Sequence, residues 1–225
     1  TNQSISIAID NDDLYEGGSS GTPETVEFSL GTFVNSVTAT NSTLTYSIVD
    51  DEDPPTIEFD VANSASSGAE TSANPTITVK TNRRSIFDSE IDYSAAAKTG
   101  TTTLTGGDYT LASGTASVAA LATSTTIPLV ITDDSKYELD ETIRITLADA
   151  NSTSQIGSAT THDYTINAND TKPALSFTAS SGTADASNPE EGDGSETITV
   201  SLAAISGVNS SVTYTCLLYT SDAAD

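Results

Sequence analysis

The chain has 225 residues, of which 36% are hydrophobic, and its 32 acidic and 7 basic residues give a formal net charge of −25. A charge of this size repels nucleic acids and anionic membranes and attracts cations. Adaptation to high salt is the alternative explanation for this negative charge. The length allows one or two domains, no apolar run is long enough to span a bilayer, and the single cysteine, Cys216, excludes an intrachain disulfide.

In chain order, the sequence repeats itself at an interval of about 120 residues. The paired segments are 5–16 with 127–138, 24–30 with 141–147, 46–48 with 164–166, 56–59 with 174–177, 76–79 with 197–200 and 91–93 with 212–214. We therefore expect residues 1–53 to be the C-terminal half of one domain, 54–170 a complete domain, and 171–215 the N-terminal half of a third. Prolines at 54, 55 and 173 predict short, stiff junctions. Because Thr1 falls inside a strand-like pattern, we expect the chain to be part of a longer protein.

The complete unit consists of short alternating segments separated by turn residues. We predict strands at 56–61, 75–81, 88–96, 113–119, 124–132, 141–148 and 158–167, with an edge or a bulge at Pro128. Tyrosines 46, 93, 164 and 214 occupy equivalent alternating positions and are predicted core residues. Seven strands in a unit of this size favour an all-β fold, with tandem immunoglobulin-like antiparallel sandwiches. No Cys-Trp-Cys spacing is present, so this is not a true immunoglobulin domain.

An acidic loop separates the fifth and sixth of these predicted strands. Five carboxylates lie within nine residues there, and Lys136 is the only local cation; the acids are Asp133, Asp134, Glu138, Asp140 and Glu141. These like charges repel one another, so something must neutralise them. A divalent cation such as Ca²⁺, which takes six to eight oxygen ligands, would do so. A solvated acidic turn is the alternative.

Five ordered motifs resemble those of the Calx-β domain family. They are 189–194 (Pro-Glu-Glu-Gly-Asp-Gly), 106–109 (Gly-Gly-Asp-Tyr), 131–134 (Ile-Thr-Asp-Asp), 137–142 (Tyr-Glu-Leu-Asp-Glu-Thr) and 46–52 (Tyr-Ser-Ile-Val-Asp-Asp-Glu). The set covers nearly all of residues 1–215. The resemblance implies a Calx-β sandwich that binds calcium at one end, through loops between strands and a closing acidic run.

The same resemblance implies a ligand set for each unit. For the complete unit the implied ligands are Glu70, Asp108, Asp133, Asp134, Glu138, Glu141 and Asp170, with Asn169 as a further candidate. For the first unit they are Asp12, Glu16, Glu24, Asp50, Asp51 and Glu52. The chain departs from the family at Leu104-Thr105, where a Thr-Ala pair is usual. The complete unit also closes with Ala168-Asn169-Asp170, which predicts a depleted site.

Catalytic interpretations are weaker. His162 is the only histidine and lies on an alternating strand, so we expect a structural or merely exposed side chain. The clustered carboxylates lack the aromatic platform of a glycosidase. Arg83 and Arg84 are expected to form a solvated turn. We therefore expect a protein that is not an enzyme.

The last ten residues, 216–225, match the translation of a transposon-type sequencing adapter codon for codon. We therefore expect a non-native tail that contributes nothing to the fold.

These features favour a calcium-binding structural or adhesive repeat of a large extracellular or cell-surface protein, with Ca²⁺ stiffening the array. The expected partners are calcium and the neighbouring repeats, with surface glycans or proteins as further candidates, and no nucleic acid or membrane insertion. A regulatory calcium-sensor domain of a membrane transporter is one alternative. An accessory module of a secreted hydrolase is the other.

Overall fold

A computed structural model describes residues 3–17, 23–37, 40–72, 74–98, 107–178 and 198–217. Within these ranges the protein is almost entirely β-structure, and the one helical element is a single 3₁₀ turn, Val61–Asn63. None of the described residues belongs to a helix that could cross a membrane. The predicted motif at 189–194 and the Leu104-Thr105 departure lie outside the described residues.

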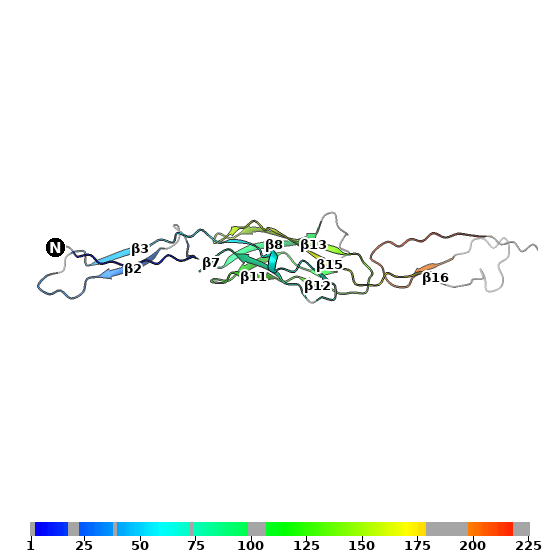
Figure 1. The fold of residues 1–225 in the computed structure, drawn as a ribbon, viewed down its shortest axis with the longest axis horizontal. Coiled ribbons are helices and arrows are strands. Elements are labelled where there is room, and N and C mark those ends of the chain that lie inside the picture. The colour runs from blue at the N-terminus through cyan, green and yellow to red at the C-terminus, as the bar shows by residue number, and fades with distance from the viewer. Residues whose placement is uncertain are drawn as a thin grey trace, which may run out of the picture.

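Two sheets pack face to face in the middle of the chain (Figure 1). The larger sheet has the order β10 (Gly114–Val118), β8 (Ser89–Ala97), β13 (Glu141–Ala150), β15 (Thr161–Asn167) and β5 (Ser67–Ala69). The smaller has the order β11 (Ser124–Ile127), β6 (Ile77–Thr81), β4 (Thr56–Phe59) and β14 (Gln155–Ile156). All pairs are antiparallel except β5 with β15 and β14 with β4. The predicted immunoglobulin-like antiparallel sandwich is confirmed.

Alternation along the strands builds the core between these sheets. In β13 the side chains of Ile143, Ile145 and Leu147 are buried, whereas the intervening positions are half-buried or exposed. Among the described residues, fifteen buried hydrophobic side chains, all between positions 57 and 166, form one cluster. Burial of each isoleucine stabilises the fold by about 1.5–3 kcal/mol. The sandwich therefore has a core of its own within the predicted unit 54–170, whose boundaries remain a prediction.

All seven predicted strands are present, but one of them divides. The segment 124–132 pairs first with β6 through β11, and after Pro128 it pairs through β12 (Val130–Ile131) with β9 (Tyr109–Thr110). Proline has no N–H to donate to a ladder, so the strand changes partners where the proline stands. This change sends the chain to the end of the sandwich where the acidic loop begins.

The segments that flank the sandwich form smaller pairs. On one side β2 (Glu24–Ser29) pairs with β3 (Thr43–Ile48), and on the other β16 (Leu175–Phe177) pairs with β17 (Val200–Leu202) (Figure 1). Each pair is antiparallel. A further parallel pair joins β1 (Leu14–Tyr15) to β7 (Arg84–Ser85).

Two predictions about individual side chains are wrong. Tyr164 is buried and Tyr93 packs against the core, but Tyr46 is 43% exposed and Tyr214 is 84% exposed. The flanking pairs have no second sheet over them among the described residues, so the equivalent faces stay open there. Arg84 is exposed, as expected, but it begins β7 rather than lying in the turn, and its Nε donates to the Leu121 carbonyl oxygen at 3.0 Å.

His162 has a structural environment. It is 4% exposed, its Nε2 lies 2.8 Å from the Ala65 carbonyl oxygen, and its ring packs against Phe59 with centroids 5.6 Å apart. This hydrogen bond ties β15 to the segment before β5.

Candidate metal centre

Three features of the fold bring acids from distant parts of the chain to one end of the sandwich. Strands β5 and β15 run parallel, so Glu70, just after β5, and Asp170, beyond β15, leave the sheet at the same end. The β9–β12 pair places Asp108 beside the start of the acidic loop, where the Thr132 amide donates to the Asp108 carbonyl oxygen at 2.9 Å. The loop itself carries Asp134 and Glu138 and ends at Glu141, the first residue of β13.

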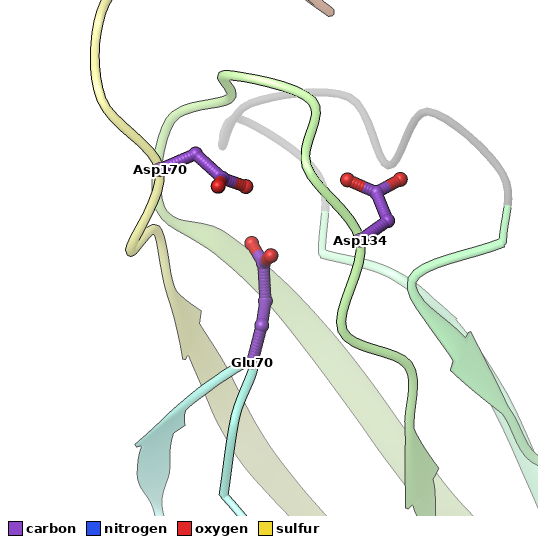
Figure 2. Close-up of side chains that lie close together, drawn as sticks. All are labelled: Glu70, Asp134 and Asp170. Atoms are coloured by element: carbon purple, nitrogen blue, oxygen red, sulfur yellow. The ribbon is translucent and has the colours of Figure 1, made fainter.

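The carboxylates form two compact trios. Glu70, Asp134 and Asp170 offer oxygen atoms that all lie within 4.8 Å of one another. Figure 2 shows that they come from three separate segments and that the carboxylates of Glu70 and Asp170 point toward each other. The second trio, Asp108, Glu138 and Glu141, meets the same 4.8 Å limit, and all three of its residues are buried. Six of the seven acids implied for this unit therefore converge.

Several of these oxygens are buried without a hydrogen-bond partner. Glu70 Oε2, Asp108 Oδ2 and Asp170 Oδ2 have no partner among the described residues, and Glu70 and Asp108 are each only 5% exposed. A buried polar group without a hydrogen bond costs roughly 1–3 kcal/mol, and more when it is charged. Hard oxygen atoms placed in this way fit a hard cation such as Ca²⁺. The donor set and its unsatisfied atoms therefore match the implied metal.

The two trios share one electrostatic environment. Burial, reinforced by the charges of Glu138 and Asp170, raises the pKa of Glu70 to about 7. Burial also raises the pKa of Glu141, with further contributions from the charge of Asp108 and a shared hydrogen bond with it. Both effects mean that the folded protein disfavours the charged form of these carboxyl groups without a cation.

Lys136 supplies the local positive charge. Its Nζ forms an ion pair of 2.5 Å with Glu138 Oε1, and this contact is the main cause that raises the pKa of Lys136. Its backbone amide donates to Asp134 Oδ1 at 2.7 Å. One ammonium group thus offsets part of the charge of the six carboxylates.

Two other loop acids form hydrogen bonds with the closing segment. Asp133, an implied ligand, lies outside both trios, and its Oδ1 accepts from Asn169 Nδ2 at 3.0 Å. Asp140 Oδ1 accepts from the Ala168 amide at 3.0 Å. Both bonds fix the closing segment 168–170 to the acidic loop, which holds Asp170 beside Glu70. The sequence did not predict these two hydrogen bonds, because no periodicity along the acidic loop distinguishes acids that face the trios from acids that bond to the closing segment.

The acids implied for the first unit also gather, but more loosely. All six line one cavity of about 650 Å³, together with Ile86 of the sandwich; they are Asp12, Glu16, Glu24, Asp50, Asp51 and Glu52. Asp50 Oδ2 accepts from the Glu16 amide at 2.8 Å. Burial and the charges of Glu24, Asp12 and Asp50 raise the pKa of Glu16. Among the described residues, these acids form no trio as compact as the two in the sandwich.

We compared the fold with the structures of known proteins. Solved structures of Calx domains are similar to this chain. The apo-form Calx CBD1 domain matches at 15% identity and a TM-score of 0.46, over 52% of this chain and 100% of that domain. The CBD12 calcium-binding domain of CALX1.1 matches at 18% identity and a TM-score of 0.44, over 55% of this chain and 50% of that one. The Calx CBD2 domain matches at 16% identity and a TM-score of 0.41, over 49% of this chain and 84% of that domain.

No protein-family model and no curated protein sequence matches the chain. The proposals that follow therefore depend on the residues of the chain itself.

Proposed function

We propose that residues 54–170 form a calcium-binding structural repeat of a large extracellular or cell-surface protein, with an adhesive or architectural rather than catalytic role. The observation that carries this proposal is the pair of carboxylate trios, in which three buried oxygens have no hydrogen-bond partner among the described residues. In the absence of a cation, the six carboxylates repel one another, and Glu70 Oε2, Asp108 Oδ2 and Asp170 Oδ2 have no hydrogen-bond partner among the described residues. Ca²⁺ relieves both penalties, because its preferred ligands are oxygen atoms and each trio supplies three carboxylates.

The role of the metal in this proposal is to stiffen one end of the sandwich. Glu70, Asp134 and Asp170 belong to three separate segments, so one ion held among them links those segments. An ion held by Asp108, Glu138 and Glu141 would link the segment before β9 to the acidic loop and the start of β13 in the same way. A domain fixed at the end where the chain passes to its neighbour suits a spacer in an array.

Calorimetry on the full chain tests the proposal. Calcium titrated at constant ionic strength should give a saturable heat, and calcium at 100-fold above its dissociation constant should stabilise the fold by about 2.7 kcal/mol. Asp134→Asn should remove most of both effects. Asp149→Asn is the matched control, because Asp149 is exposed at the other end of β13 and its positive φ of 54° suits asparagine equally well.

Generic acidity predicts a different outcome. Sodium chloride would then stabilise the protein as well as calcium does, and the two Asp→Asn variants would behave alike. The affinity also separates two classes of function. Dissociation constants of 10⁻⁴–10⁻³ M are typical of extracellular modules, whereas sensor domains bind in the range of 10⁻⁷–10⁻⁵ M. The absence of any saturable calcium heat would refute the site.

A further inference from the structure

A short parallel pairing joins the N-terminal segment to the sandwich. Leu14 and Tyr15 of β1 lie opposite Arg84 and Ser85 of β7, and the Ile86 amide donates to the Tyr15 carbonyl oxygen at 3.0 Å. The Tyr15 side chain is only 6% exposed, and its ring lies edge-on to Phe87 with centroids 6.1 Å apart. Tyr15 is therefore a buried anchor between two parts of the chain.

A second contact of the same construction joins the sandwich to the C-terminal segment. Tyr137 forms a parallel bridge with Ser206. The Tyr137 amide donates to the Ile205 carbonyl oxygen at 3.1 Å, and the Gly207 amide donates to the Tyr137 carbonyl oxygen at 2.8 Å. As at Tyr15, the amide that follows the bridged serine donates to the tyrosine carbonyl.

The sequence repeat relates the two contacts to each other. Tyr137 follows Tyr15, and Ser206 follows Ser85, at the repeat interval of about 120 residues. Each serine also holds its own turn in the same way. The Phe87 amide donates to Ser85 Oγ at 2.9 Å, and the Val208 amide donates to Ser206 Oγ at 3.3 Å. Segments 84–87 (Arg-Ser-Ile-Phe) and 205–208 (Ile-Ser-Gly-Val) share only the serine.

Backbone pairing explains why so little sequence identity is needed. The hydrogen bonds across each contact join main-chain atoms, so the flanking side chains are free to differ. The serine hydroxyl stabilises the local turn by accepting from the amide two residues further on. At the first contact Tyr15 also supplies apolar surface that the contact buries, whereas Tyr137 is half-buried at the second.

We propose that this tyrosine and this serine form a docking joint that recurs between successive units of the repeat. The tyrosine of each acidic loop is the docking residue of one unit, and the serine turn is the surface of the next unit that receives it. The kind of partner that this surface fits is therefore another unit of the same array. The joint fixes the orientation of neighbouring units, which the short proline-containing connections restrain in length but not in rotation. It requires no metal and goes beyond the proposed calcium binding.

Amide hydrogen exchange on the full chain in chelator tests the joint, so a failure of calcium binding would not affect the result. The Ile86 and Gly207 amides should exchange more slowly than exposed amides. Tyr15→Ala should speed exchange at Ile86 at least tenfold and leave Gly207 unchanged, and Tyr137→Ala should do the reverse. Tyr46→Ala is the matched control, because Tyr46 is 43% exposed on β3 and should alter neither amide.

A distance measurement covers the case in which a tyrosine variant loses its fold. In a chain with Cys216→Ser, spin labels at Thr45→Cys and Thr126→Cys place one probe on β3 and one on β11, both at exposed positions. A narrow distance distribution is expected, and Ser85→Gly should broaden it. Unprotected Ile86 and Gly207 amides in the unmodified chain, or a broad distribution without any substitution, would overturn the proposal.

Discussion

Replacing Glu70 by glutamine should make the calcium-free protein more stable at pH 8 but not at pH 5. Glu70 is 5% exposed, and its Oε2 has no hydrogen-bond partner among the described residues. Glutamine keeps the size of the side chain and removes its charge. Any gain in stability therefore measures the cost of holding a carboxylate in this position without a metal.

The sign and size of the effect follow from the pKa of Glu70. Burial and the neighbouring acids raise this pKa from 4.5 to about 7. The folded state holds the Glu70 proton more tightly than the unfolded state does. The contribution of Glu70 to the free energy of unfolding is therefore greatest below pH 4.5 and declines as the pH rises to about 7. A tenfold difference in proton affinity between the two states corresponds to about 1.4 kcal/mol, so the loss by pH 8 is about 3 kcal/mol. Glu70→Gln should remove this loss.

Urea unfolding of the full chain in chelator, at pH 5 and at pH 8, measures the difference. Glu58→Gln is a control of opposite sign, because hydrogen bonds from the Ala159 amide and from Ser158 lower the pKa of Glu58. This control should destabilise the protein at pH 8. If Glu70→Gln leaves the difference between the two pH values unchanged, the carboxylate trio does not form in solution.

Three further predictions concern other parts of the molecule. Asp163→Asn should destabilise the fold by about 1 kcal/mol in urea unfolding at pH 7, because the Arg144 and Lys98 side chains bind the Asp163 carboxylate and lower its pKa. Below the folded-state pKa of Asp163 the carboxylate is protonated and this stabilisation is lost, so the variant should have no effect there. Deleting residues 216–225 should leave the melting temperature unchanged, because Cys216 and Leu217 are exposed; a loss above about 1 kcal/mol would contradict the adapter interpretation. Ala168→Asp should raise the calcium affinity measured by calorimetry, since the first unit has Asp50 at the equivalent position; Asn169 is kept because its hydrogen bond to Asp133 holds the closing segment.

Alternation and turn residues were enough to predict seven strand segments of the complete unit. The pattern at Ile143, Ile145 and Leu147 specifies one buried face whatever strand lies beside it. The change of sheets at Pro128 was predictable as a bulge or an edge but not as a change of partner. Which strand a segment pairs with depends on long-range contacts that local alternation does not encode. The short strands β5, β7, β9 and β14 were missed for the same reason.

The candidate site was predictable as a set of residues but not as a geometry. The resemblance and the repeat indicated Glu70, which lies far from the acidic loop in sequence, and the structure places it beside Asp134 and Asp170. The division into two trios depends on side-chain burial, which acidity alone does not indicate. The role of Asp133 as a hydrogen-bond acceptor for Asn169 depends on the path of the closing segment.

The exposed apolar faces of the flanking segments lead to a last prediction, which concerns the association of the chain with itself. By the repeat, Phe177 and Ile198 correspond to Phe59 and Ile77. The first two are 57% and 78% exposed, and the second two are at most 1% exposed. In the first unit, Ile5 is 79% exposed, whereas its counterpart Ile127 is buried; Leu30 and Leu147 show the same contrast.

Residues 171–215 are the predicted front half of a sandwich and residues 1–53 a back half, so the C-terminal segment of one copy complements the N-terminal segment of another. We therefore expect the purified chain to associate end to end under reducing conditions, with an average mass in analytical ultracentrifugation that rises with concentration. Phe177→Asp should weaken this association by placing a charge where a core residue is required. Val61→Asp is the control, since Val61 is 54% exposed on the 3₁₀ turn of the sandwich. A chain that remains monomeric at high micromolar concentration would show that the two faces do not complement each other.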